Sequence, residues 1–205
     1  MATEKKSKIN TKEDLKCFLR VESKLYGNAS KGLFYAYLDS LRSTPQSDQF
    51  YIWKYVKTLR MSEYYYNNSL KFQKSFMAFI RTIQYYFSLH SLRRYSYKTG
   101  IQISINTFDE GLQIYHFGTI IVNERSIVGK NATILPGVVV GEKNGETPII
   151  GDNCYIGASS KVLGGITIGD NVTIAPNAVV VKDVPSNSVV AGVPAKVIKT
   201  KTELL

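Results

Sequence analysis

A period of six residues runs through the second half of the chain and leaves few folds open to it. Counted from residue 150, six successive hexads begin with an aliphatic residue: Ile150, Ile156, Val162, Ile168, Ile174 and Val180. A second run with the same spacing lies upstream and comprises Val122, Val128, Ile134 and Val140. A period of six fits neither an α-helix nor the simple alternation of a strand. It is typical of a parallel β-helix, in which three hexads complete one coil and the aliphatic residues stack inside.

Residues suited to tight turns lie between these aliphatic positions. Gly151-Asp-Asn153 and Gly169-Asp-Asn171 follow an aliphatic residue at the same place in their hexads. Short Val/Ile hexads of this kind predict the left-handed β-helix, an exception to the usual right-handed crossover. Ten residues separate Val140 from Ile150, so we expect a loop within residues 142–148.

The first half of the chain has a helical pattern instead. Apolar residues recur at helical spacing and predict helices over residues 11–26, 31–41, 50–59 and 70–89, with a turn at 43–48. The fold class predicted is therefore α+β, with a basic, tyrosine-rich helical domain over 1–98 and a β-helix over 99–205. No window is apolar enough for a membrane span, and the N-terminus lacks the pattern of a secretory signal, which predicts a cytoplasmic protein. The two cysteines match no metal or redox spacing, and no metal site is expected.

The net charge of +10 comes entirely from the first half. Residues 1–98 contain 18 Lys and Arg against 7 Asp and Glu, whereas residues 99–205 contain 8 against 9. Such a half could attract an anionic polymer, an acidic membrane surface or a phosphorylated cofactor, or it could simply form a solvated helical face. No nucleic-acid motif is present, so a nucleic-acid partner is not expected, whereas peripheral contact with a membrane stays open.

Histidine is scarce in this chain, and its two occurrences differ in context. His90 falls in a predicted helix, and His116 interrupts a strand-like stretch. Stepping back six residues from Val122 places His116 on a rung of the aliphatic ladder. Imidazole titrates near neutral pH and suits proton transfer, but a histidine satisfied by local hydrogen bonds at the edge of the core is the alternative.

Four segments resemble the serine-acetyltransferase-like branch of the hexapeptide-repeat acyltransferases. They are Gly100-Ile-Gln-Ile103, Gly111-Leu-Gln-Ile-Tyr-His-Phe-Gly118, Ile120-Ile-Val-Asn123 and Val190-Ala-Gly-Val-Pro-Ala-Lys-Val197. The resemblance covers residues 98–199, and the helical half is similar to short members associated with polysaccharide biosynthesis. It implies transfer of an acetyl group from acetyl-CoA to a hydroxyl, in a homotrimer with sites between subunits.

The resemblance also implies roles for individual residues. His116 would be the general base for direct attack on the thioester, and Gln102 matches the position of the residue that orients it, although a backbone carbonyl is an alternative. Small residues would leave room for pantetheine at three positions: Gly157, Ala158 and Ala175. Lys182 and Lys196 would meet the phosphates of CoA, unless they are ordinary surface lysines.

Departures from the resembled family concern the acceptor. Tyr115 stands where serine acetyltransferases have an Asp that holds an ammonium group, and the loop at 142–148 lacks the Arg and His expected there, with Lys143 as its cation. With Asn123, these residues would form the acceptor side. Because buried charges need partners, the sequence predicts a saccharide acceptor. A serine O-acetyltransferase is the second alternative, and a non-catalytic trimeric scaffold or glycan-binding protein is the third.

Overall fold

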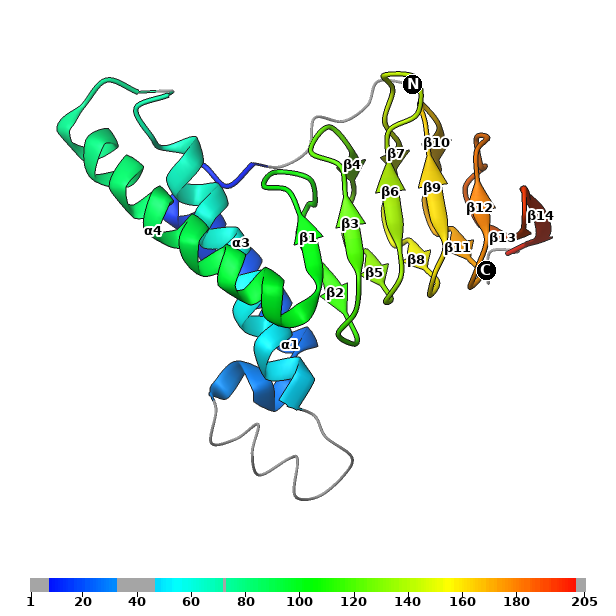
Figure 1. Ribbon diagram of the computed structural model, residues 1–205, viewed down its shortest axis with the longest axis horizontal. Coiled ribbons are helices and arrows are strands. Elements are labelled where there is room, and N and C mark those ends of the chain that lie inside the picture. The colour runs from blue at the N-terminus through cyan, green and yellow to red at the C-terminus, as the bar shows by residue number, and fades with distance from the viewer. Residues whose placement is uncertain (1–7, 33–46, 72, 202–205) are drawn as a thin grey trace. The chain divides into compact units, whose positions relative to one another are not determined.

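A computed structural model describes residues 8–32, 47–71 and 73–201. The chain divides into two compact units, residues 1–100 and residues 101–205. Helices make up the first unit and strands the second (Figure 1). No helix in the described part of the chain is long and apolar enough to cross a membrane.

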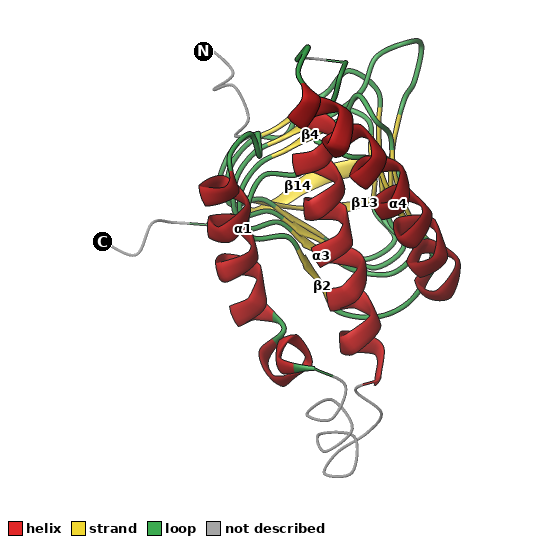
Figure 2. Cartoon of the chain, turned by 90° about the vertical axis from the view of Figure 1, so that its left-hand side faces the viewer, coloured by secondary structure: helices red, strands yellow, loops and turns green. Residues whose placement is uncertain are grey.

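The helical unit contains α1 (Lys12–Leu25), the 3-10 helix η1 (Gly27–Lys31), α3 (Ser47–Asn67) and α4 (Phe76–Thr99). Helix α3 lies between α1 and α4 (Figure 2). The Thr11 hydroxyl accepts a hydrogen bond from the backbone N–H of Asp14, and the Asp14 carboxylate accepts one from the N–H of Thr11, which fixes the start of α1. The side chain of Ser75 caps α4 in a similar way.

The boundaries of the longer helices differ from the sequence prediction. Helix α3 continues eight residues beyond the predicted end at residue 59, because its tyrosines pack within the unit. Helix α4 begins at Phe76 rather than at residue 70, since Ser75 supplies the cap. Ser47 and Asp48 begin α3 instead of ending a turn. Most of the predicted helix at 31–41, and the predicted turn at 43–46, lie outside the described residues.

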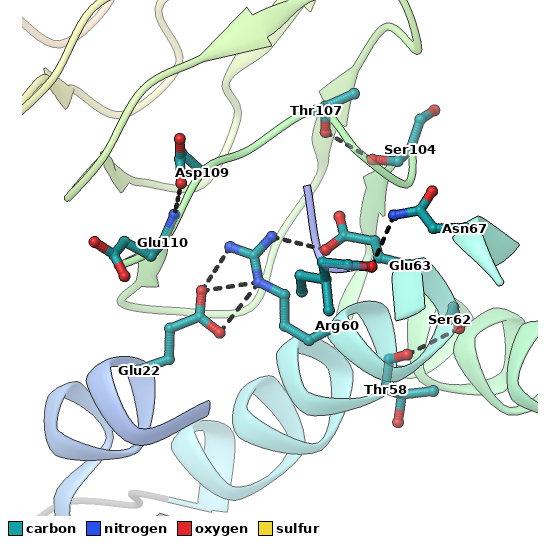
Figure 3. Close-up of polar contacts among 11 residues, drawn as sticks. Glu22, Thr58, Arg60, Ser62, Glu63, Asn67, Ser104, Thr107, Asp109 and Glu110 are labelled. Atoms are coloured by element: carbon teal, nitrogen blue, oxygen red, sulfur yellow. Dashed lines mark hydrogen bonds and ion pairs between the residues drawn. The ribbon is translucent and has the colours of Figure 1, made fainter. Parts of the chain in front are cut away.

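A buried ionic cluster joins α1 to α3 (Figure 3). The guanidinium of Arg60 lies 2.6 Å from Glu22 and 3.0 Å from Glu63, and none of the three side chains is more than 2% exposed. Burial alone would lower the pKa of Arg60, but the two carboxylates outweigh it and hold that pKa above its usual value. Arg60 is therefore charged at any accessible pH, and the cluster contains two carboxyl groups for one guanidinium.

Further polar contacts tie distant segments of the helical unit together. The Asn67 amide donates a hydrogen bond to the carbonyl of Ile9 at 3.0 Å, and the Ser62 hydroxyl donates one to Ser88 on α4 at 3.0 Å. A small apolar core of Ile9, Phe18 and Tyr64 lies beside them. These contacts span up to 58 residues of sequence, so local pattern alone does not encode them.

The second unit consists of short strands. They are β1 (Ile101–Ile103), β2 (Gln113–Ile114), β3 (Ile120–Val122), β4 (Ile127–Val128), β5 (Thr133–Ile134), β6 (Val139–Gly141), β7 (Ile149–Ile150), β8 (Tyr155–Ile156), β9 (Lys161–Leu163), β10 (Thr167–Ile168), β11 (Thr173–Ile174), β12 (Val179–Val180), β13 (Ser188–Gly192) and β14 (Ala195–Thr200). All neighbours pair in parallel except β13 and β14, which are antiparallel. The strands form three sheets, with the orders β1-β3-β6-β9-β12, β10-β7-β4 and β14-β13-β11-β8-β5-β2.

The register of these sheets stacks the aliphatic residues in columns. One column runs through Ile103, Val122, Val140, Val162 and Val180. Another runs through Ile114, Ile134, Ile156, Ile174 and Val190. A third contains Val128, Ile150 and Ile168, with isolated bridges to Phe108 and Val184 at its ends. Every one of these side chains is buried, which confirms the parallel β-helix predicted from the six-residue period.

Asparagine makes the sharp corners of this β-helix. Four residues at equivalent turns have φ between 54° and 59°: Asn131, Asn153, Asn171 and Asn187. Asparagine tolerates this left-handed region better than most residues. Their side chains also bond between coils, from Asn131 to Asn153 at 3.0 Å and from Asn171 to Asn187 at 2.9 Å.

Candidate active site

The structure places His116 outside the aliphatic column, not on it. Ile114 fills the predicted rung and pairs with Ile134, whereas the His116 side chain, two residues further on, is exposed. Eight residues rather than six separate Ile114 from Val122, because the intervening turn is two residues longer. The predicted register is therefore wrong at this step, and its correction brings the imidazole into solvent.

The lengthened turn rests on the next coil. Gly118 has a φ of 147°, and a Cβ at this position would lie 2.7 Å from the Cβ of Pro136. The N–H of Gly137 donates a hydrogen bond to the carbonyl of Thr119 at 2.7 Å. Only a residue without a side chain fits between the turn and Pro136, so Gly118 allows the chain to present His116 outward.

Tyr115 lies beside His116, with ring centroids 6.5 Å apart and planes inclined at 37°. The Tyr115 side chain is 42% exposed. Among the described residues, His116 has no hydrogen bond or ion pair. Gln102 is an exposed residue of β1 that pairs with Ile121, and no hydrogen bond joins it to His116. The orienting role predicted for Gln102 thus has no contact within one chain to support it.

Small residues follow the Ile114 column at one corner of the β-helix. Tyr115 and His116 come directly after Ile114, and the equivalent positions in the later coils are Leu135-Pro136, Gly157-Ala158, Ala175-Pro176 and Ala191-Gly192. Gly157, Ala158 and Ala175 therefore belong to the corner that begins with His116. The structure gives a second reason for glycine at position 157, since a Cβ there would lie 2.6 Å from the carbonyl oxygen of Ile174.

The two lysines expected near the CoA phosphates lie at different corners. Lys196 on β14 pairs with Ala191, at the C-terminal end of the His116 corner. Lys182 follows Val180 of β12 and belongs to the neighbouring column. Both side chains are exposed, but only Lys196 shares the corner of the small residues within one chain.

Asn123 and Lys143 have local structural roles. The Asn123 side chain accepts a hydrogen bond from the N–H of Arg125 at 2.9 Å, which closes a turn. The backbone of Lys143 forms hydrogen bonds with the backbone of Glu146 across the tip of the loop predicted at 142–148. The guanidinium of Arg125 forms an ion pair with Glu142 at the base of this loop.

Lys161 was not identified from the sequence, yet it lies at the His116 corner. Its ammonium donates hydrogen bonds to the carbonyls of Gly137 at 2.6 Å and Ser159 at 3.0 Å, and so ties two coils together. The sequence could have drawn attention to this residue, because Lys161 is the only basic residue at the sixth position of the hexads from residue 150 onward. The lysine places a positive charge close to the small residues.

The cysteine of the β-helix is not a nucleophile. Cys154 is buried, and burial raises the pKa of its thiol to about 11. At neutral pH the group is a protonated thiol, and only a thiolate attacks carbonyls readily. No group of three or more His, Cys, Asp or Glu residues suited to a metal ion occurs in the described part of the chain.

Comparison with known proteins finds a family model that matches part of the six-residue repeat. Residues 147–182 match the family model for the bacterial transferase hexapeptide (six repeats). The chain is therefore similar to that family over this part of the β-helix.

Curated relatives and solved structures narrow the comparison. Serine acetyltransferase of Staphylococcus aureus strain N315 is 41% identical over 106 residues, which cover 49% of this chain and 50% of the relative. Serine acetyltransferase 2 of Arabidopsis thaliana is 40% identical over 98 residues, covering 46% of this chain and 30% of the relative. The chain therefore spans half or less of the length of these relatives. The crystal structure of serine acetyltransferase from Brucella abortus strain S19 superposes with a TM-score of 0.63 at 25% identity, covering 92% of this chain and 70% of that one.

These comparisons overturn the predicted saccharide acceptor. The two relatives and the solved structure described above are named serine acetyltransferases, not polysaccharide acetyltransferases. The prediction was wrong because it judged charge complementarity at two sequence positions, Tyr115 and the loop at 142–148. A zwitterion can be held by any charged groups that the folded, assembled protein brings to the site, and sequence spacing does not locate those groups.

Proposed function

We propose that this protein is an acetyl-CoA-dependent O-acetyltransferase whose acceptor is L-serine. The observation that carries the proposal is the position of His116, exposed at the head of a corner whose later coils bear Gly157, Ala158 and Ala175. The similarity to serine acetyltransferases supports the choice of acceptor. A related structure of 23% identity, with a TM-score of 0.61, is a serine acetyltransferase in complex with coenzyme A.

In the proposed reaction a neutral imidazole acts as the general base. His116 takes the proton of the serine hydroxyl while the oxygen attacks the thioester carbonyl, and the tetrahedral intermediate then expels the sulfur of CoA. The thiolate takes up the proton, so that the products are O-acetylserine and CoA. Imidazole suits this role because its ordinary pKa lies near the operating pH.

Direct attack fits the side chains at this site better than a covalent acetyl-enzyme. A covalent route needs an activated nucleophile near the base. The cysteine of this unit, Cys154, is buried and protonated at neutral pH. His116 has no hydrogen bond to a serine or threonine hydroxyl in the described part of the chain, so the acceptor hydroxyl itself is the group left to deprotonate.

The corner of small residues supports the donor side of the proposal. Ala158 and Ala175 are half-buried and carry no side chain beyond Cβ, so an extended pantetheine could lie against the backbone there. Lys196, at the end of the same corner, and Lys182 would supply positive charge for phosphates.

A homotrimer is the proposed assembly. Three large apolar side chains point outward from the sheets of the β-helix, and each is between 38% and 39% exposed: Ile121, Ile127 and Tyr155. Outward apolar groups on different sheets suit a closed ring of copies, in which each copy presents two unlike faces. Sedimentation velocity would measure the mass, and a monomer at micromolar concentration would contradict this assembly.

The central test is the His116→Ala variant in an assay of CoA release with acetyl-CoA and L-serine. Removing a general base costs roughly 10²–10⁴ in rate, so we expect kcat to fall by that factor. Because His116 is exposed, the variant should unfold at the same denaturant concentration as the wild type. His90→Ala, at an exposed position of α4, is the matched control and should keep full activity.

Two results would contradict the proposal. A His116→Ala variant with wild-type kcat would remove the imidazole from the mechanism. A wild-type protein that releases no CoA with L-serine would favour the non-catalytic scaffold instead.

A further inference from the structure

One face of α4 is apolar and exposed over its first half. Phe76, Phe79, Ile83, Tyr86 and Phe87 are between 43% and 77% exposed. Their spacing of three, four, three and one residues places them on one side of a helix. We call these five residues the outer face of α4. The buried side chains of the same helix lie on the opposite side: Ala78, Ser88, Leu92 and Thr99.

This face is too apolar for a helix whose outer side meets only water. A surface helix normally carries charged and polar residues on its outer side. Single exposed apolar side chains are ordinary, but a contiguous group of large ones marks a surface that binds something. The neighbouring Met77 is also 54% exposed and extends the apolar area.

Basic residues flank the outer face at both ends. Lys71 and Lys74 precede it and Arg93, Arg94 and Lys98 follow it, all with exposed side chains. The sequence contains no Asp or Glu between residues 64 and 108. The whole helical unit, residues 1–100, has 18 Lys and Arg against 7 Asp and Glu, a net charge of +11. The partner of this face should therefore be apolar in part and strongly anionic.

We propose that the outer face of α4 docks on an anionic lipid surface. Aromatic side chains are favoured at the boundary between headgroups and acyl chains, and basic side chains at either end can reach lipid phosphates. Clusters of Lys and Arg beside an apolar face are attracted by acidic lipids. The proposal concerns binding only, and it stands or falls separately from the acetyl transfer assigned to His116.

The charge around the outer face of α4 favours a lipid surface over two other possible partners. A second copy of the chain would bring the flanking arginines and lysines of α4 near those of its partner, with no acidic residue on this helix to pair with them. A single-stranded nucleic acid would satisfy the basic groups and could stack on the rings of this face, but the exposed apolar area of Ile83 and Met77 would gain nothing from a nucleic-acid backbone. An anionic bilayer accepts both the apolar and the basic side chains.

The experiment measures co-sedimentation of the full chain with vesicles. One set consists of phosphatidylcholine alone, and the other contains one third phosphatidylglycerol. We expect binding to the anionic vesicles, weakened by high salt, and little binding to the neutral ones. Absence of binding to anionic vesicles, or equal binding to both sets, overturns the proposal.

Two pairs of variants assign the binding to α4. Arg93→Gln/Arg94→Gln should weaken binding roughly 25-fold, since each basic group near an acidic surface contributes roughly fivefold. Lys12→Gln/Lys16→Gln removes the same charge from exposed positions of α1 and should change binding less than threefold if α4 is the contact. An equal loss in both variants would mean diffuse attraction by the whole unit, which contradicts a docking face.

The apolar contribution is tested by Phe76→Ser/Phe79→Ser/Phe87→Ser. Because these side chains are exposed, the variant should fold, which circular dichroism checks. We expect binding to anionic vesicles to fall on the order of a hundredfold. If the same variant instead dissociates an oligomer in the absence of lipid, or loses binding to an oligonucleotide while vesicle binding persists, the face belongs to another partner and the proposal is wrong.

Discussion

The two units of this protein are stabilised by different kinds of contact. In the β-helix the strand residues pair with those one coil away, so that a six-residue pattern repeated along the sequence sets both the core and the corners. In the helical unit the main polar contact joins Glu22 to Arg60, 38 residues away, and no repeat marks it. The comparison teaches that a repeated fold distributes its stability over many equivalent contacts, whereas the helical unit concentrates it in a few.

Replacing Glu22 by alanine should produce the largest loss of stability. The change leaves the buried Arg60 with Glu63 as its remaining carboxylate in the cluster. Breaking a buried ion pair costs about 3–5 kcal/mol, and here the Nε and Nη2 groups of Arg60 would stay buried without their hydrogen-bond acceptor. Urea unfolding followed by circular dichroism would measure the loss, and hydrogen exchange would show that it falls on residues 8–100.

A matched control is Glu13→Ala, which removes a carboxylate from an exposed position of the same helix. We expect its effect to stay below about 1 kcal/mol. A Glu22→Ala protein as stable as the control would show that the cluster does not hold α1 against α3, and the contrast between the units would fail.

Within the β-helix, Ile156→Ala should be the most damaging single truncation of the central column. Ile156 is fully buried between Ile134 and Ile174. Removing most of such a side chain costs roughly 2–5 kcal/mol, and we expect about 3 because adjoining coils can relax only partly. Ile156→Val, which removes one methylene, should cost roughly 0.5–1.5 kcal/mol.

Hydrogen exchange would show how many coils lose amide protection when Ile156 is truncated. Because each coil contacts only its neighbours, protection should fall first at β5, β8 and β11. A uniform fall across all coils would mean that the β-helix behaves as one cooperative block, and that it resembles the helical unit more than its repeats suggest.

The same contrast explains which features the sequence could predict. The rungs from Val122 to Val180 follow from the period alone, because the register of a β-helix is set one coil at a time. His116 was misplaced by two residues, since a longer turn between Ile114 and Val122 breaks the period without changing the pattern on either side. The Glu22–Arg60–Glu63 cluster has no sequence signal, because charged residues on a helix usually face water.

The acceptor substrate illustrates a different limit of prediction from sequence. Tyr115 and Lys143 were interpreted from their positions relative to a family pattern, and the structure adds one local contact for each, with His116 and with Glu146. The identity of a substrate depends on groups brought together in three dimensions. A candidate base is easier to choose, since His116 is the only histidine of the β-helix unit, and its role stays a prediction.

The smallest predicted effect concerns a corner of the β-helix. Asn153 has a φ of 55°, and its side chain accepts a hydrogen bond from Asn131. Alanine in this left-handed region costs about 1–2 kcal/mol, whereas glycine adopts it freely. We therefore expect Asn153→Ala to lower the free energy of unfolding by about 1 kcal/mol more than Asn153→Gly does. Urea titration of both variants measures the difference, which separates backbone strain from the loss of the bond that both changes remove. If the two variants were equally unstable, the inter-coil hydrogen bond rather than the turn conformation would explain asparagine at this corner, and the column would depend on side-chain contacts as the helical unit does.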